Sequence, residues 1–292
     1  MDLQNVLQPI ITDLLQLEKE IEFQKAKIIE EAEDLRNHHF LKEIVNHIFS
    51  ESGKYLRPAL VFLSARAVNG SVHEDLQEYV SIIKFATAVE FLHSASLIHD
   101  DIIDGSRFRR NHITLNEQYD GKIAVLVGDI LYSQFFSIMF NLDVEKKKHG
   151  ELLQLFLKIT KNMCFGELSE QRLREPIIDP SIEEYLEVIE NKTACLMAGS
   201  CQGGAILAGA DRDALSALTR YGRYLGLSYQ LIDDYIDGDS ILKASAYMVE
   251  KAKEYTELIK TELASLKETP SRHTLFQLCD FIVEEIHIKA GK

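Results

Sequence analysis

The residues best suited to chemistry are two copies of one aspartate pattern. Asp-Asp-x-x-Asp occurs at residues 100–104 and again at residues 233–237. With 18 aspartates in 292 residues, chance would give about 0.07 such triplets, so two copies indicate function. Positions i and i+4 of a helix project from the same face, about 5–6 Å apart, so the outer aspartates of each copy are neighbours. The six candidate metal ligands are Asp100, Asp101, Asp104, Asp233, Asp234 and Asp237.

Paired carboxylates at this spacing favour a bound cation. Like charges at i and i+4 destabilise a helix unless a cation lies between them. Oxygen ligands suit Mg²⁺, which keeps several waters and often joins one or two carboxylates to the phosphates of a substrate. Each copy also follows apolar residues, which places its acids at the end of a buried helix. Acidic helix ends are common, but the repeated triplet indicates a magnesium and phosphate site instead.

Two basic clusters could bind a second phosphate group directly. The first, at residues 52–58, combines a glycine that lets the backbone approach an anion with Lys54 and Arg57. The second, at residues 107–110, places three arginines directly after the first aspartate motif. Arginine suits bidentate phosphate contacts. Basic stretches are usually only solvated, but beside the aspartate motifs these two indicate a second anionic substrate.

The elements that must position these residues are helical. Apolar residues from Leu3 to Ile21 alternate spacings of four and three, which predicts a helix within residues 1–36 packed on the core. A coiled-coil arm is the alternative. Further helical patterns cover residues 76–104, 121–140, 149–173, 181–209, 212–237, 246–267 and 272–288. Long alternating strand patterns and Gly/Ser/Pro-rich linkers are absent from the sequence. We therefore predict an all-α fold, a bundle of antiparallel helices forming one domain over residues 1–292.

Composition excludes some functions. The chain has 46 acidic and 32 basic side chains, a formal net charge of −14. General nucleic-acid binding requires a basic surface and is excluded, and an anionic membrane surface should repel the chain. The four cysteines form no Cys-x-x-Cys pair, which indicates buried thiols in a reducing compartment. We expect no apolar run near membrane-spanning length and no secretory signal, and hence a cytoplasmic protein.

Taken in order along the chain, these motifs resemble those of the trans-isoprenyl diphosphate synthases, also called polyprenyl synthetases. The resemblance is close over residues 50–240. Besides the aspartate motifs it includes Gly53-Lys54, Arg57-Pro58, Glu90 to His93, Arg109-Arg110, Gly128-Asp129, Gly166-Glu167, Lys192-Thr193 and Gln230. It implies a helical bundle around a central cavity. It also implies head-to-tail condensation of isopentenyl diphosphate with an allylic diphosphate to make an all-trans polyprenyl diphosphate.

The resemblance assigns a role to each group of residues. Three Mg²⁺ ions, bridged by substrate diphosphate, are expected at the aspartates, with Asp100, Asp104 and Asp233 stabilising the charge of the leaving group. The other three aspartates complete the metal environment. The expected ligands of isopentenyl diphosphate are Lys54, Arg57, His93 and Arg110. The expected contacts of the allylic diphosphate are Arg109 and Lys192. Thr193 and Gln230 are expected as a polar pair beside the carbocation. For His99, Asp129 and Glu167, a structural hydrogen-bonding role explains the residue equally well.

The sequence departs from the family pattern in three places. Ser52 and Tyr55 stand where a glycine and a basic residue are usual, and Asn111 replaces a glycine after the arginine pair. After the second aspartate motif, a lysine-containing loop is missing. We expect that the printed chain omits a flexible segment near residues 239–245. The alternative is a true deletion, which would weaken or inactivate the enzyme unless Lys243 substitutes for the missing lysine.

Product length depends in this family on the space below the first aspartate motif. The small residues Ala95 and Ser96 leave that passage open, and Phe135 and Phe136 could form a deeper floor. Ordinary core packing would explain these residues equally well. We expect a product longer than fifteen carbons.

Family members are usually homodimers, so we expect a homodimer. Two alternatives stay open. The chain could be a weakened or non-catalytic subunit of a heteromeric synthase. More remotely, Glu90-x-x-His93 and Glu284-x-x-His287 could build a carboxylate-bridged di-iron bundle with oxidase activity, but that hypothesis leaves the aspartate motifs unexplained. A terpene cyclase is not expected to carry the second diphosphate site at Lys54 and Arg57.

Overall fold

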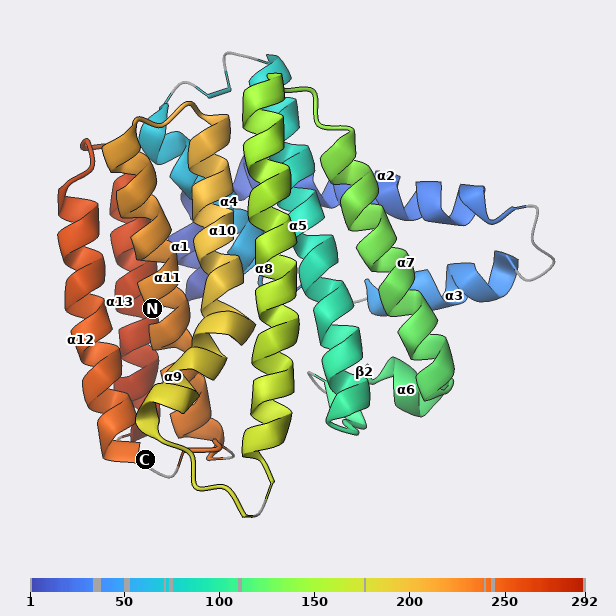
Figure 1. The fold of residues 1–292 in the computed structure, drawn as a ribbon. Helices are drawn as coiled ribbons and strands as arrows, with labels where there is room; N and C mark the ends of the chain where they lie inside the picture. Colours follow the sequence, from blue (N-terminus) through green and yellow to red (C-terminus); the bar gives the residue numbers. More distant parts are fainter. Residues whose placement is uncertain are drawn as a thin grey trace. The chain divides into compact units, whose positions relative to one another are not determined.

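The computed structural model describes residues 2–33, 38–49, 53–70, 72–73, 76–109, 112–175, 177–238, 240–242 and 245–290. The elements are α1 (Leu3–Leu7), η1 (Gln8–Ile10), α2 (Ile11–Glu31), α3 (His38–Ile48), α4 (Leu56–Val68), α5 (Leu76–Ile103), β1 (Phe108–Arg109), β2 (His112–Ile113), α6 (Leu115–Gln118), α7 (Gly121–Phe140), α8 (Lys146–Leu173), α9 (Ile182–Ile189), η2 (Glu190–Ala194), α10 (Cys195–Leu207), α11 (Arg212–Asp237), α12 (Ser245–Ala264) and α13 (Pro270–Ala290). Helices thus make up nearly all regular structure in the described part, and the all-α prediction is confirmed (Figure 1).

Contacts along the chain cluster in two compact units. The larger unit comprises residues 1–11, 59–82 and 144–292, and the smaller unit comprises residues 12–58 and 83–143. The first aspartate motif belongs to the smaller unit and the second to the larger. The single domain over residues 1–292 stays a prediction.

In the larger unit, α11 packs between α10 and α12, and α13 contacts both α11 and α12 (Figure 1). The close approach of α11 to η2 depends on glycine, because a Cβ at Gly226 of α11 would lie 2.6 Å from the Cα of Ala194 in η2. The Asp211 side chain accepts a hydrogen bond from the Ala214 amide and caps the start of α11. Gly238, in the left-handed conformation with φ of 70°, ends it. The second aspartate motif therefore occupies the last turns of a helix held on several sides.

In the smaller unit, α5 ends with the first aspartate motif. Gly105, with φ of 62°, then turns the chain into a short antiparallel hairpin in which Arg109 pairs with His112. The Thr114 hydroxyl donates to the Ser106 carbonyl at 2.7 Å and closes the base of this hairpin. The turn therefore brings the second basic cluster back toward the aspartates.

The N-terminal helices bury the apolar positions expected from their spacing. Leu3, Leu7, Ile10, Leu17 and Ile21 are all at most 8% exposed. These side chains lie in α1, η1 and α2. Their burial favours packing onto the folded chain over a coiled-coil arm.

Two helices are long and apolar enough to cross a membrane by length and composition, α5 and α7. The expectation that no apolar stretch approaches that length is therefore wrong. In α5, 72% of the most apolar stretch is buried, which is typical of a core helix. In α7 the buried share is 44%, and Val125, Leu126 and Phe140 are exposed. Buried helices of globular proteins meet the same criterion, so length and composition alone are weak evidence for a membrane span.

Candidate active site

The aspartates of the first motif differ in their surroundings. Asp101 is 6% exposed, and its two carboxylate oxygens accept hydrogen bonds from Nε of Arg109 at 2.9 and 3.0 Å. Nη2 of Arg109 lies 2.8 Å from Oδ1 of the same carboxylate. Asp100 is half-buried and Asp104 is exposed. Because adjacent helix positions point about 100° apart, Asp101 faces the hairpin while the outer pair faces elsewhere.

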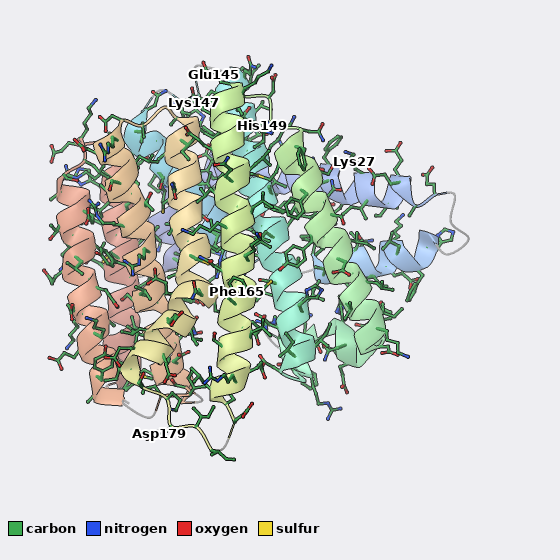
Figure 2. The ribbon with its side chains drawn as sticks, viewed as in Figure 1. Lys27, Glu145, Lys147, His149, Phe165 and Asp179 are labelled. Carbon is green, nitrogen blue, oxygen red and sulfur yellow. The ribbon has the colours of Figure 1, made fainter. Side chains whose placement is uncertain are left out.

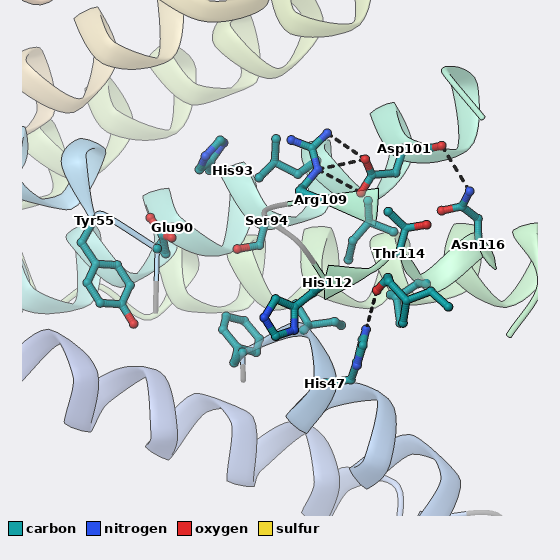
Figure 3. Close-up of a pocket in the computed structure, with 17 residues that line it drawn as sticks. His47, Tyr55, Glu90, His93, Ser94, Asp101, Arg109, His112, Thr114 and Asn116 are labelled. Atoms are coloured by element: carbon teal, nitrogen blue, oxygen red, sulfur yellow. Dashed lines mark hydrogen bonds and ion pairs between the residues drawn. The ribbon is translucent and has the colours of Figure 1, made fainter. Parts of the chain in front are cut away.

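A cavity of about 140 Å³ in the smaller unit brings together several of the predicted residues (Figure 3). Its lining includes Gly53, Tyr55, Glu90, His93, Asp101 and Arg109. Just outside this lining, Nη1 of Arg57 lies 2.9 Å from Nε2 of His93. The cavity therefore combines hydrogen-bonding groups with the ion pair of Arg109 and the buried Asp101.

Tyr55 replaces the usual basic residue at the edge of this cavity. Its φ of 46° lies in the left-handed region, which is unfavourable for a tyrosine and typical of strained loops at functional sites. Burial, with a further contribution from nearby Glu90, raises the pKa of the Tyr55 phenol well above its usual value. The position is therefore neutral, and the neighbouring Lys54 is exposed. Positive charge at the cavity comes instead from Arg57 and Arg109.

Two further histidines line the cavity, His47 and His112. Nε2 of His47 lies 3.0 Å from the carbonyl oxygen of Ile113, which ties α3 to the hairpin (Figure 3). Sequence analysis did not select either histidine, because neither belongs to a motif. Their place in the cavity depends on contacts between distant parts of the chain.

The second motif lies within a chain of hydrogen bonds in the larger unit. Oδ1 of Asp234 accepts from Nε2 of Gln230, and Oδ2 accepts from the Tyr185 hydroxyl, both at 2.7 Å. The Thr193 hydroxyl donates to Oε1 of Gln230 at 2.8 Å, so the predicted polar pair is in contact. Asp233 is exposed, and the side chain of Asp237 lies outside the described part of the chain.

Tyr185 is a site residue that sequence analysis missed. It is 1% exposed, and its burial, together with the charge of Asp234, raises the pKa of its phenol well above the usual value. It therefore stays a neutral donor. The available sequence signal was its position seven residues before Lys192, about two helical turns away.

Lys192 lies in η2, a π-helical turn between α9 and α10. Its Nζ is 2.6 Å from Oε2 of Glu167 and 2.7 Å from Oε2 of Glu170. Burial would raise the pKa of Glu170, but Lys192 and Arg174 outweigh it and hold that pKa below its usual value. Glu167 and Glu170 thus hold the predicted diphosphate ligand in a fixed place. Single π-helical turns are frequent at functional sites.

His99 has well-defined structural contacts. Its ring packs against the backbone of Gly128, where an added Cβ would collide with it. Nε2 lies 3.3 Å from the Val125 carbonyl oxygen and 3.7 Å from Oδ1 of Asp129. These contacts join α5 to α7 and support the structural interpretation of His99 and Asp129.

The predicted chain-length residues all lie in the smaller unit. Ala95 and Phe135 are fully buried, and the rings of Phe135 and Phe136 are 4.9 Å apart. The Ser96 hydroxyl donates to the carbonyl of His93 at 2.8 Å, one turn earlier in α5. Ser96 therefore has a backbone partner as well as a small side chain.

Several predicted residues lie outside the described part. They are Ser52, Arg110, Asn111 and Lys243, and the side chains of Glu284 and His287. The segment near 239–245 is described only at 240–242 and in the backbone of Ser245. Within the described ranges, no group of three or more His, Cys, Asp or Glu side chains could hold a metal ion by itself.

Comparisons with known proteins agree with the resemblance that the sequence motifs indicate. A family model described as Polyprenyl synthetase matches residues 38–253. A short chain isoprenyl diphosphate synthase of Methanothermobacter thermautotrophicus is 36% identical over 192 residues, 65% of this chain and 56% of the relative. Heptaprenyl diphosphate synthase component 2 of Bacillus subtilis is 36% identical over 197 residues, 68% of this chain and 53% of the relative. The chain thus matches a little over half the length of these relatives.

Among solved structures, the fold is similar to that of a polyprenyl synthase from Caulobacter crescentus complexed with calcium and isoprenyl diphosphate. The two have a TM-score of 0.81 at 23% sequence identity, and the match covers 97% of each chain. At this identity the likeness shows a shared fold.

Proposed function

Because this chain belongs to the polyprenyl synthetase family, we propose that it is a prenyltransferase that condenses isopentenyl diphosphate head-to-tail with an allylic diphosphate. The product is an all-trans polyprenyl diphosphate. The observation that carries the proposal is the cavity beside the first aspartate motif, which Gly53, His93, Asp101 and Arg109 line together. This combination of acids and cations suits a diphosphate substrate that binds with a metal ion.

The difficult step is loss of diphosphate from the allylic substrate, which concentrates negative charge on the leaving group. Asp100 and Asp104 in the smaller unit and Asp233 in the larger unit would hold Mg²⁺, with three ions expected from the family resemblance, and bound Mg²⁺ would act as a Lewis acid toward that charge. Arg109 and Lys192 are the direct cationic contacts that we propose for the diphosphate. Both cations are already oriented by carboxylates, Arg109 by Asp101 and Lys192 by Glu167 and Glu170.

The second substrate binds where the basic loop meets α5. Lys54, Arg57, His93 and Arg110 hold the diphosphate of isopentenyl diphosphate, and Lys54, which is exposed, is open to the incoming substrate. Thr193 and Gln230 present dipoles, without a net charge, beside the carbocation that the double bond attacks. The released diphosphate then accepts the proton lost from the new product.

We propose that the enzyme is cytoplasmic and homodimeric. Its four cysteines are all free, which is typical of a reducing compartment. Leu157, Phe165 and Leu168 leave an apolar stripe exposed along α8, where Figure 2 labels Phe165. Light scattering should give about twice the chain mass of 33.3 kDa, and Leu168→Glu should lower it, whereas the control Ile177→Glu, also at an exposed apolar residue, should not.

One alternative is favoured by a specific observation. A relative at 36% identity is named component 2 of a heptaprenyl diphosphate synthase, and a component is part of a larger assembly. This chain could likewise be one subunit of a heteromeric synthase.

Product length is left open by family membership, because one relative is named a short chain isoprenyl diphosphate synthase and another a heptaprenyl diphosphate synthase component. The buried, small Ala95 supports our proposal of a product longer than fifteen carbons.

The test is to incubate the purified chain with Mg²⁺, isopentenyl diphosphate and a series of allylic primers, and to size the products by chromatography. We expect diphosphate release and products longer than fifteen carbons from farnesyl diphosphate. Elongation that stops at fifteen carbons would contradict the length proposal only. Absence of diphosphate release with every primer would contradict catalysis by the single chain and favour the heteromeric alternative.

A further inference from the structure

A continuous series of hydrogen bonds crosses the larger unit and ends at the predicted polar pair. The Tyr185 hydroxyl donates to Oδ2 of Asp234 at 2.7 Å. Oδ1 of Asp234 accepts from Gln230, whose carbonyl oxygen accepts from Thr193 at 2.8 Å. The series joins three elements of the fold: α9, α11 and η2.

The chemistry of each group fixes the direction of every bond. An ionised carboxylate only accepts, so Gln230 must turn its NH₂ toward Asp234 and its carbonyl toward Thr193. Thr193 must then donate its one hydroxyl proton to Gln230. The remaining lone pairs of Thr193 are directed away from Gln230. Thr193 arranged in this way presents the negative end of its hydroxyl dipole, which is what a developing carbocation requires.

We propose that Tyr185 is a positioning residue for this reaction, which fixes the orientation of Gln230 and Thr193 through Asp234. The inference rests on the proposed function. Tyr185 and Thr193 are 1% and 7% exposed, and Asp234 and Gln230 are half-buried, so the series is partly shielded from water, which strengthens its bonds. Asp234 has a hydrogen bond on each oxygen, which gives it an orienting role beside the exposed Asp233.

The kinetic test is Tyr185→Phe, which removes one oxygen atom and keeps the ring that fills the core. We expect kcat for condensation to fall about tenfold, with little change in KM for isopentenyl diphosphate and in the melting temperature. In a Thr193→Val background the same substitution should have almost no further effect, because the series no longer reaches the substrate. Multiplicative losses in the double variant would overturn the proposal. Tyr224→Phe, on the same helix as Gln230 but stacked on Tyr255, is the matched control and should leave kcat unchanged.

A second readout is independent of catalysis. In protein labelled with ¹⁵N at glutamine side chains, the Gln230 amide resonances, assigned by their loss in Gln230→Leu, should shift in Tyr185→Phe and stay in place in Tyr224→Phe. Unchanged resonances in Tyr185→Phe would overturn the proposal even if the wild type is active. If Tyr185→Phe shifts these resonances but the wild-type chain shows no condensation, the hydrogen-bond series is retained and the proposed function is rejected. If Tyr185→Phe does not fold, Asp234→Asn, which leaves one acceptor oxygen where Tyr185 and Gln230 need two, must shift the same resonances, and an unchanged spectrum would overturn the proposal.

Discussion

The middle aspartate of each motif occupies a different environment from its neighbours. Asp101 binds Arg109, and Asp234 binds Tyr185 and Gln230. Helix geometry predicts that the outer aspartates share a face and that the middle one points away. It does not predict the partner, because Arg109 reaches Asp101 through a hairpin and Tyr185 is 49 residues from Asp234. Spacing therefore identified the acids, and only the tertiary structure divides them by role.

The outer aspartates should be essential for turnover. Replacing Asp100 with alanine removes a carboxylate proposed to hold Mg²⁺ against the leaving diphosphate, so turnover should fall about hundredfold or more at saturating substrate. Release of diphosphate measures this effect. Asp213→Asn, at an exposed aspartate in the first turn of α11, is the control and should retain full activity. Near-normal turnover by Asp100→Ala would remove the role assigned to that residue.

The cysteines should differ sharply in reactivity. Burial raises the pKa of Cys201 to about 12 and that of Cys279 to about 12, whereas Cys164 is exposed. At pH 8, about one buried thiol in 10⁴ would be ionised, and the thiolate is the reactive form. Titration of the native protein with a disulfide reagent should therefore show a fast phase that Cys164→Ser removes. A fast phase that persists in Cys164→Ser but disappears in Cys164→Ser/Cys195→Ser would come from the half-buried Cys195, and one that persists in both variants would show that a buried thiol is accessible.

At the scale of elements, the π-helical turn η2 shows what a periodic pattern cannot reveal. The sequence pattern predicts one helix over residues 181–209, and the structure interrupts it at Glu190–Ala194. A π-helical turn shifts the register by only one residue, so the apolar repeat on either side hardly changes. The hairpin after the first motif was also missed, since strands of two residues leave no alternating pattern. Both missed features carry site residues, Lys192 and Thr193 in η2 and Arg109 in β1.

Two glycines of α8 give a matched test of how closely that helix approaches η2. A Cβ at Gly166 would lie 2.6 Å from the backbone nitrogen of Lys192, whereas a Cβ at Gly150 would meet nothing within 4 Å. Gly166→Ala should lower the free energy of unfolding by about 1–3 kcal/mol, because backbone must move. Gly150→Ala should raise it by up to about 1 kcal/mol through helix propensity. Urea unfolding measures both. Equal effects of the two substitutions would show that α8 and η2 are not in close contact.

At the scale of the whole molecule, the net charge of −14 has a local exception. A strongly acidic chain should repel diphosphate, yet six of its acids form the two motifs proposed to bind it with a metal ion. Composition therefore argues against general nucleic-acid binding. It says nothing against the binding of small anions, because a few bound cations reverse the sign of the potential within one site. The all-α fold followed from helical periodicity, which is a property of every segment.

Metal and diphosphate should stabilise the protein cooperatively. A ligand at 100 times its dissociation constant adds about 2.7 kcal/mol to the free energy of unfolding. Mg²⁺ with inorganic diphosphate should therefore raise the melting temperature by more than the sum of the shifts that each gives alone. Addition of a chelator should abolish the difference. A full shift with diphosphate alone would mean that the cationic side chains suffice and the aspartates bind no metal.

The boundaries between the two compact units have a consequence for protease sensitivity. Three of the four junctions, at residues 11–12, 58–59 and 82–83, fall inside the continuous helices α2, α4 and α5. The fourth, at residues 143–144, lies between α7 and α8. A protease needs several residues of extended chain, which a helix does not offer. Of the four junctions, limited digestion should therefore nick only the one near residue 143, and neither compact unit should be released whole, because each is made of segments that continue into the other as helix.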